Sequence, residues 1–302
     1  MRIVVALGGN ALLERGEPPD SDIQEHHVAS AVDALGPLLR DHDLIITHGN
    51  GPQVGVLAVE SAGDPALSRP YPFDVLGAQT QGMIGYWLVQ ALQGAAAGRP
   101  GVCLLCRTVV KAHDPAFARP SKFVGPVYDQ ATALQLAGEH GWDVRQDGSA
   151  WRRVVPSPEP AEIVELDVIR LLAGKGVIVV CAGGGGIPVV ADDAGVLRGV
   201  EAVVDKDLTA ALLAQAVGAD ALLLLTDVGA VIDGYGTPQA QPIRRATTRE
   251  LRTRSFPAGS MGPKVEAVCR FVEATGAVAA IGRLSDATAL LNGTAGTTVV
   301  PS

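Results

Sequence analysis

In residues 2–10, RIVVALGGN, an apolar run leads directly into two glycines, and this arrangement is the strongest local indication of the fold. The run from Ile3 to Leu7 has the composition of a strand that is buried on both faces of a parallel sheet. Gly8 and Gly9 allow close approach of the backbone to a ligand, and a strand, a glycine turn and a helix in succession often bind phosphate. The stretch therefore predicts an anion site, although an ordinary tight turn fits the same residues.

The positive charge for such a site has to come from elsewhere in the chain. No lysine follows the glycines as the P-loop pattern G-x-x-x-x-G-K-[ST] requires. The 302-residue chain carries a formal net charge of -8, which disfavours nucleic acid or an anionic membrane as partner. Aromatic residues make up only 4% of the chain, which argues against a surface that stacks bases. We therefore expect a local positive pocket that binds small anionic molecules.

The sequence shows no secretion, membrane or redox signal. The chain enters a strand at once, and no apolar run reaches the roughly 18 residues that span a bilayer, so we expect a cytoplasmic protein. Cys103 and Cys106 have C-x-x-C spacing inside an apolar run. In a strand these two positions face opposite sides, so we expect inert buried thiols, and no metal site.

Strand-like and helix-like segments alternate along most of the chain. This pattern predicts an α/β fold with a doubly wound, mainly parallel sheet in two fused lobes and helices on both faces. We expect an N-terminal lobe over residues 1–199 and a C-terminal lobe over 200–302. Residues 112–158 interrupt the alternation with five prolines and predict a small protruding subdomain. Single elements expected from the pattern are strands at 2–7, 102–110, 200–204 and 297–300, and helices near 74–97, 160–173, 207–217 and 262–275.

Ligands of such sheets bind at the carboxyl ends of the strands. Four clusters of glycine or polar residues follow predicted strands and should meet in one cleft: Gly8-Gly9-Asn10, residues 47–51, Gly183 to Gly186, and Thr226-Asp227.

The segment THGNGPQVG, residues 47–55, is the stronger of the two N-terminal anion signals. Gly49 and Gly51 flank Asn50, and Pro52 suits the first turn of a helix whose N-terminus then favours an anion. His48 is either a general base or a structural hydrogen-bonding residue, and we favour the structural role. The run Gly183 to Gly186 lacks the helix and the spacing of a dinucleotide fingerprint, so NAD binding is disfavoured.

Three lysines are candidates for the missing charge. Lys206 lies between Asp205 and Asp207 at the start of a predicted helix, where Asp207 can hold an ammonium in place. Lys264 follows a Gly-Ser-Met-Gly loop at another helix start, a pattern that suits nucleotide phosphates. Lys122 lies in the predicted subdomain. Each of these positions, taken alone, also fits a solvated surface lysine.

Together, these motifs resemble the carbamate kinases of the amino-acid kinase superfamily over the whole chain. The segments that carry the resemblance are ALGGNALL, THGNGPQVG, QGMIGYWLVQAL, DPAF, KFVGPVYD, WRRVVPSP, GGGGIPV, GVEAVVDKDL, LTDV and AGSMGPKVEA. The resemblance implies reversible transfer of phosphate between ATP and carbamate, with Mg²⁺ carried on the nucleotide. It also implies a homodimer, and a reaction that runs towards ATP in arginine catabolism.

The resemblance assigns roles to individual residues. It implies that carbamate or carbamoyl phosphate binds to the backbone of Gly8, Gly9, Asn10, Gly49, Asn50 and Gly51. The nucleotide is expected near Lys206, Thr226, Asp227, Tyr235, Met261 and Lys264. Lys122, Lys206 and Lys264 would stabilise charge, and Asp207 would organise the lysines. No side chain is assigned to the metal.

Three alternatives stay open at this point. Another kinase activity of the superfamily, such as one acting on acetylglutamate, is the first of them. A nucleotide-binding sensor without catalysis is the second, and a dehydrogenase, disfavoured by its glycine spacing, is the third. The segment between Tyr235 and Gly259 is shorter than the family pattern, and this difference affects the expected contacts of the nucleotide at the adenine pocket.

Overall fold

The computed structural model describes residues 1–14, 16–257 and 259–302, and for Asn10 only the backbone. Its main feature is an eight-stranded sheet in the order β15-β17-β16-β12-β1-β2-β9-β3. In that order the strands are Arg245–Thr247, Thr297–Val300, Val278–Arg283, Ala221–Thr226, Arg2–Leu7, Asp43–His48, Ile178–Val180 and Gly101–Cys103. The β16–β17 pair is antiparallel and the other pairs are parallel. The predicted doubly wound, mainly parallel sheet is confirmed.

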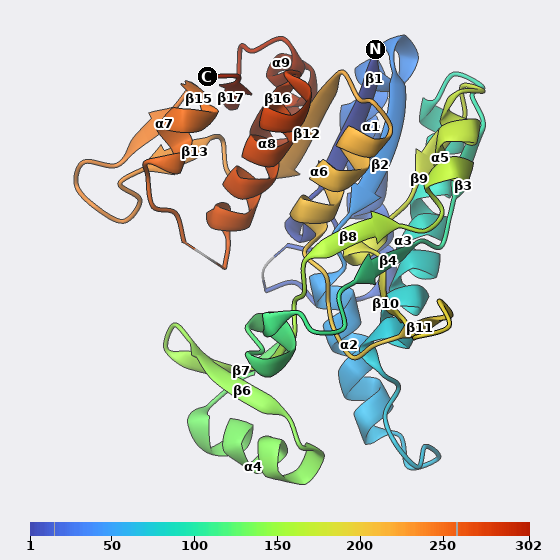
Figure 1. The fold of residues 1–302 in the computed structure, drawn as a ribbon, viewed down its shortest axis with the longest axis vertical. Coiled ribbons are helices and arrows are strands. Elements are labelled where there is room, and N and C mark those ends of the chain that lie inside the picture. The colour runs from blue at the N-terminus through green and yellow to red at the C-terminus, as the bar shows by residue number, and fades with distance from the viewer. Residues whose placement is uncertain (15, 258) are drawn as a thin grey trace.

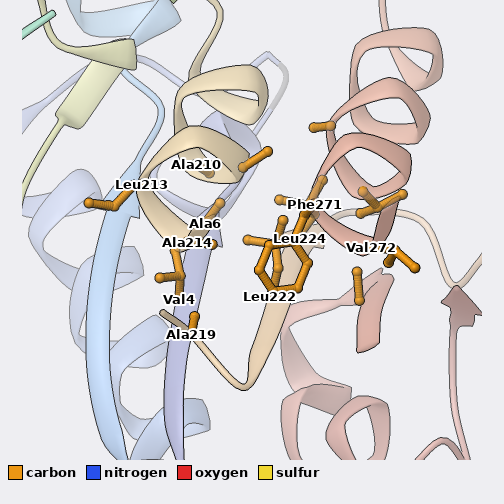
Figure 2. Close-up of a cluster of buried hydrophobic side chains, with 14 of the residues drawn as sticks. Val4, Ala6, Ala210, Leu213, Ala214, Ala219, Leu222, Leu224, Phe271 and Val272 are labelled. Atoms are coloured by element: carbon orange, nitrogen blue, oxygen red, sulfur yellow. The ribbon is translucent and has the colours of Figure 1, made fainter. Parts of the chain in front are cut away.

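Strand β1 lies in the middle of this sheet, and its alternate side chains enter two different cores. Val4 and Ala6 pack against α6 (Lys206–Ala216) and α8 (Met261–Thr275), as Figure 2 shows. Ile3, Val5 and Leu7 pack on the other face against α1 (Ser21–Asp41) and α3 (Phe73–Ala95). Because both faces are covered, every residue from Ile3 to Leu7 is buried, which explains why the strand is a continuous apolar run.

Helices cover the two faces of the sheet, and the molecule has three layers (Figure 1). The remaining helices are α2 (Gly51–Gly63), α4 (Gln130–His140), α5 (Leu166–Ala173), α7 (Thr248–Arg252) and α9 (Ala287–Leu291). No helix in the described part of the chain is long and apolar enough to cross a membrane.

Two smaller sheets flank the main one. The first has the order β11-β10-β4-β8, with strands Leu197–Gly199, Ile187–Ala191, Arg107–Val110 and Pro160–Ile163. The second pairs β13 (Val231–Asp233) with β14 (Gln241–Ile243).

The protruding subdomain is a three-stranded sheet in the order β5-β7-β6 with α4 beside it. Its strands are Lys122–Tyr128, Ala150–Val155 and Asp143–Asp147. In Figure 1 it lies below the main sheet, away from both chain ends. The Arg153 guanidinium fixes it to the body, because it lies 4.8 Å from the Phe73 ring of α3 and 4.6 Å from the Trp142 ring. The predicted lobe boundary at residue 199 stays a prediction.

Three expected elements are wrong in detail. The single strand expected at 102–110 is two strands, β3 and β4, because the Gln81 side chain binds both the N–H and the carbonyl of Cys106 and separates them. The helix expected at 160–173 begins at Leu166, since residues 160–163 pair with β4. Residues 200–204 form no strand. Val200 and Val203 donate to Pro188 and Pro156 on two different segments.

Candidate functional site

Two glycine turns meet where β1 and β2 end. The Gly8 N–H donates to the Leu225 carbonyl at 2.8 Å, and the Gly49 N–H donates to the Leu7 carbonyl at 2.9 Å. A methyl group added to Gly49 would lie 2.9 Å from the Gly9 nitrogen. The turns therefore pack backbone against backbone, which only glycine permits. The sequence predicted both turns but not this contact between them.

Buried polar side chains hold the second glycine turn, at Gly49 and Gly51, in place. Asn50 Nδ2 donates to the Thr80 hydroxyl at 2.9 Å, and His48 Nδ1 lies 2.9 Å from the Gly49 carbonyl oxygen, which can only accept. Burial lowers the pKa of His48 to about 4. The hydrogen bond to Gly49 acts in the opposite direction and raises the pKa, and the charge of Lys206 lowers it. A neutral imidazole that donates to the backbone fits the structural role for His48.

The run Gly183 to Gly186 supports that turn. Side chains at Gly183 and Gly184 would overlap His48 and Asn50, respectively. The hydroxyls of Thr108 and Thr209 donate to the Gly185 carbonyl at 2.8 and 3.0 Å. Strand β10 follows in place of a helix, so the run is a packing surface and does not have the dinucleotide-binding arrangement.

The start of α6 brings two lysines onto one carboxylate. Asp207 Oδ1 accepts from Lys206 Nζ at 2.9 Å, and Asp207 Oδ2 accepts from Lys264 Nζ of α8 at 2.8 Å. Asp207 is 4% exposed. Because α6 and α8 pack side by side, Lys206 and Lys264 meet although 57 residues separate Asp207 from Lys264.

Charge and burial compete at this carboxylate. Burial raises the pKa of Asp207, but the ammonium groups of Lys206 and Lys264 outweigh it and hold that pKa well below its usual range. Burial lowers the pKa of Lys206 in spite of Asp207, whereas for Lys264 the attraction of Asp207 outweighs burial and raises the pKa. This trio of side chains forms two ion pairs that share the one carboxylate of Asp207.

Lys122 comes to the same place from the subdomain. Its Nζ donates to Asp205 Oδ2 at 2.6 Å, and Asp205 Oδ1 accepts from the N–H groups of Asp207 and Leu208 at the start of α6. The sequence analysis missed this role of Asp205. An aspartate directly before a helical pattern is the sequence signal for an N-cap residue. This signal indicated the capping of α6 but not the bond with Lys122.

A cleft of about 480 Å³ opens beside the trio. Its wall contains predicted residues from four segments, including the start of α8: Gly8, Gly9, Thr226, Asp227, Tyr235, Met261 and Lys264. Lys206 lies against the second glycine turn, since a methyl group on Gly49 would lie 3.3 Å from Lys206 Cε. Lys264 thus lies in the cleft wall and Lys206 lies beside Gly49, while Asp207 binds both ammonium groups.

Several predicted residues lie differently from the rest. Tyr235 borders the cleft but is 74% exposed. Gly51 is the exposed first residue of α2, and the side chain of Asn10 lies outside the described part of the structure. The sequence analysis also missed most of the apolar wall, which contains Val228, Ala230, Ile232, Phe256 and Pro257. Their apolar character gave no signal that distinguished them from core residues.

The cysteines do not have the features of reactive thiols. All four are free thiols. Burial raises the pKa of Cys103 to about 11, which makes its thiol a poor nucleophile at neutral pH. Within residues 1–14, 16–257 and 259–302, no cluster of three or more His, Cys, Asp or Glu side chains is arranged to hold a metal ion.

Comparison with known proteins agrees with this geometry. The model of the amino acid kinase family matches residues 1–282. A carbamate kinase of Rhizobium meliloti is 50% identical over 306 residues, covering 100% of this chain and 94% of that protein. A carbamate kinase of Escherichia coli is 48% identical, covering 98% of each chain. The solved structure of the Giardia lamblia carbamate kinase bound to AMP-PNP has a TM-score of 0.90 and 38% identity, covering 100% of this chain and 98% of that one.

Proposed function

Because the chain belongs to the amino acid kinase family, and within it to the carbamate kinases, we propose that it transfers phosphate reversibly between ATP and carbamate. In the direction of ATP synthesis, ADP attacks carbamoyl phosphate. A bond forms between phosphorus and the β-phosphate oxygen of ADP, and the bond from phosphorus to the carbamate oxygen breaks. Phosphoryl transfer of this kind needs alignment and charge neutralisation more than covalent help from the protein.

The observation that carries this proposal is the carboxylate of Asp207 between two ammonium groups, at 2.9 Å from Lys206 and 2.8 Å from Lys264. Lys206 lies beside Gly49 and Lys264 lies in the cleft wall. In our proposal the phosphoryl group moves between these two places, so positive charge lies on both sides of it in advance. Charge that is already in position stabilises a transition state without further reorganisation. Asp207 holds the lysines and takes no proton.

The acceptor end is assigned to the two glycine turns. The proposal has the backbone of Gly8, Gly9, Asn10, Gly49, Asn50 and Gly51 bind carbamate or carbamoyl phosphate. Lys122 then closes that end from the subdomain. Carbamate is already an anion and needs no general base, which agrees with a neutral, buried His48.

The nucleotide is assigned to the cleft of about 480 Å³, a volume in the range of small-molecule pockets. Its apolar wall suits a base, and Thr226 and Asp227 suit the ribose and phosphates. Mg²⁺, bound with the nucleotide, would neutralise charge on the phosphate oxygens, and the Asp227 carboxylate in the wall is an oxygen donor of the kind this ion accepts.

The first experiment mixes the purified protein with Mg²⁺, ADP and carbamoyl phosphate and measures ATP, with Lys206→Ala as a parallel sample. We expect ATP from the native protein and a large loss in the variant. Folded protein that binds ADP but forms no ATP would overturn the proposal. A panel of other acceptors, including acetylglutamate, would then separate another kinase activity from a nucleotide-binding sensor.

The biological direction and the assembly are part of the same proposal. We propose that the reaction runs towards ATP in arginine catabolism and that the protein is a homodimer, both on the resemblance alone. Rates in both directions at equal substrate concentrations test the first point. Light scattering of the purified protein tests the second point, because the molar mass distinguishes one subunit from two.

A further inference from the structure

One carboxylate connects the subdomain to the helix that carries Lys206 and Asp207. Asp205 Oδ1 accepts from the N–H groups of Asp207 at 2.9 Å and Leu208 at 3.2 Å. Its other oxygen, Oδ2, accepts from Lys122 Nζ at 2.6 Å across 83 residues of sequence. The Asp205 side chain is 12% exposed, so the carboxylate end of this bridge is largely shielded from water.

We infer that Asp205 is a positioning residue that holds the Lys122 ammonium over the acceptor end of the site through its Oδ2, while its Oδ1 anchors it to α6. The inference rests on the proposed function, because it assigns Lys122 to the phosphoryl transfer. Asp205 itself touches no substrate in this scheme.

The two halves of the bridge support each other. The first N–H groups of a helix have no partner within the helix, so the two bonds to Oδ1 are fixed by the backbone of α6. Fixing Oδ1 also fixes Oδ2, because the carboxylate is planar and rigid. Lys122 therefore finds its charge partner at a constant distance from the α6 backbone that carries Lys206 and Asp207.

Lys122 needs such a partner. It is the first residue of β5, in a small sheet outside the main one, and its side chain is 35% exposed. A free lysine side chain samples many rotamers, and holding it in one position costs that conformational entropy. Without Asp205 the Lys122 ammonium would move freely in solvent. It would then have to be ordered again in every turnover.

Capping alone does not account for Asp205. Asparagine caps a helix about as well as aspartate, since either side chain offers one oxygen to the backbone. The second oxygen and the negative charge are what Lys122 uses. The cluster also stays attractive to an anion, because Lys122, Lys206 and Lys264 carry three positive charges against the two carboxylates of Asp205 and Asp207.

The test uses Asp205→Asn, which keeps the cap and removes the charge. We expect kcat/KM for carbamoyl phosphate to fall about tenfold or more, because a misplaced catalytic group costs rate steeply. The KM for ADP, whose cleft contains Lys264 but not Lys122, should change less than about threefold by the same reasoning. In a Lys122→Ala background, Asp205→Asn should change kcat/KM less than about twofold, since the two residues act as one unit. Independent losses in the double variant would overturn the inference.

Two further variants separate positioning from folding. Asp205→Ala removes the cap as well and should lower the melting temperature, whereas Asp205→Asn should leave it unchanged. Asp129→Asn is the matched control, since Asp129 caps α4 of the subdomain by accepting from the Thr132 N–H at 2.9 Å. It should leave both the melting temperature and kcat/KM unchanged.

Hydrogen exchange without substrate distinguishes the failure of this inference from the failure of the proposed function. Asp205→Asn should speed exchange of the β5 amides in substrate-free protein, and Asp129→Asn should not. If the native protein forms no ATP but this contrast is present, the bridge holds and the proposed function fails. If the native protein forms ATP and Asp205→Asn matches it in both exchange and kcat/KM, Asp205 is only a helix cap and the inference fails.

Discussion

At the scale of single residues, the site depends on how Asp207 shares its two oxygens between Lys206 and Lys264. Both ammonium groups are largely buried, each with a side chain 15% exposed, so neither is well solvated by water. A buried charge is tolerated only with a partner, and here one carboxylate serves two. One positive charge is left over, and an anionic phosphoryl group is the partner that we assign to it.

The first prediction concerns the two lysines of this trio. Lys206→Ala and Lys264→Ala should each reduce turnover about 10²–10³-fold or more, because each removes a charge that is positioned before the reaction begins. ATP formation from ADP and carbamoyl phosphate measures the effect, with a thermal unfolding scan to show that the variants are folded. Lys175→Ala, at an exposed lysine between α5 and β9, is the control and should keep full activity. A loss below about tenfold in folded Lys206→Ala or Lys264→Ala protein would contradict the assigned roles.

The second prediction concerns the alkaline side of the pH profile. Burial lowers the pKa of Lys206, so this ammonium loses its proton, and the site its charge, at a lower pH than an ordinary lysine. Asp207→Asn removes the carboxylate that opposes this loss, so the pKa values of Lys206 and Lys264 should both fall. The alkaline limb of residual kcat should then move to lower pH by about one unit or more.

Chromatographic measurement of ATP avoids any effect of pH on a coupling enzyme in that experiment. Asp207→Glu keeps the charge and is the matched control. An alkaline limb at the same pH in native protein and Asp207→Asn would show that neither lysine sets it.

At the scale of elements, helix α2 and strand β5 determine where the subdomain lies. A methyl group on Gly55 of α2 would lie 2.7 Å from the Gly125 Cα of β5, so the two backbones touch. Gly125 has a φ of +72°, a conformation that other residues rarely adopt. Lys122 begins the same strand, so this contact sets how far its ammonium reaches.

The third prediction follows from that contact. Gly55→Ala should reduce kcat/KM for carbamoyl phosphate about tenfold or more, because β5 and Lys122 are displaced from the acceptor site. Gly63→Ala is the control in the same helix, since a methyl group there meets no atom within 4 Å. Both changes favour the helix intrinsically, by up to about 1 kcal/mol, so a loss in Gly55→Ala alone isolates the contact. Equal activity of the two variants would mean that the position of the subdomain does not limit the reaction.

At the scale of the whole molecule, one continuous sheet joins the segments before and after residue 199. Strand β1 pairs with β2 on one side over six residue pairs and with β12 on the other over five, both in parallel register. The glycine turns and the lysine-bearing helices α6 and α8 are therefore mounted on the same rigid support. This explains how a site built from distant segments keeps a constant geometry.

The fourth prediction tests that support. Leu224 of β12 is 1% exposed and lies in the core between the sheet, α6 and α8 (Figure 2). Leu224→Ala should lower the free energy of unfolding by about 2–5 kcal/mol, through lost burial and the cavity that remains. Denaturant unfolding followed by far-UV circular dichroism measures it. Leu171→Ala, at a leucine 62% exposed on α5, should stay within about 0.5 kcal/mol of the native protein.

Much of the architecture follows from local sequence patterns. Apolar runs predicted the central strands β1, β2 and β12, because a strand buried on both faces shows no alternation. The strand expected at 102–110 shows the limit of this reasoning. The side chain of Gln81, 25 positions before Cys106, separates this segment into two strands that belong to different sheets.

The two glycine turns, and the helix starts on which Lys206 and Lys264 lie, could be predicted from the sequence alone. These features are local, since a turn conformation or a helix N-terminus depends on a few neighbouring residues. The resemblance implied that Asp207 organises the lysines, but the contacts of its two oxygens with Lys206 and Lys264, and the bond from Lys122 to Asp205, come from the tertiary structure. Such contacts depend on how α6, α8 and β5 pack, and packing is set by side chains far away in sequence. The positive charge missing after Gly8 and Gly9 is therefore supplied by the fold, from three segments brought together on one sheet.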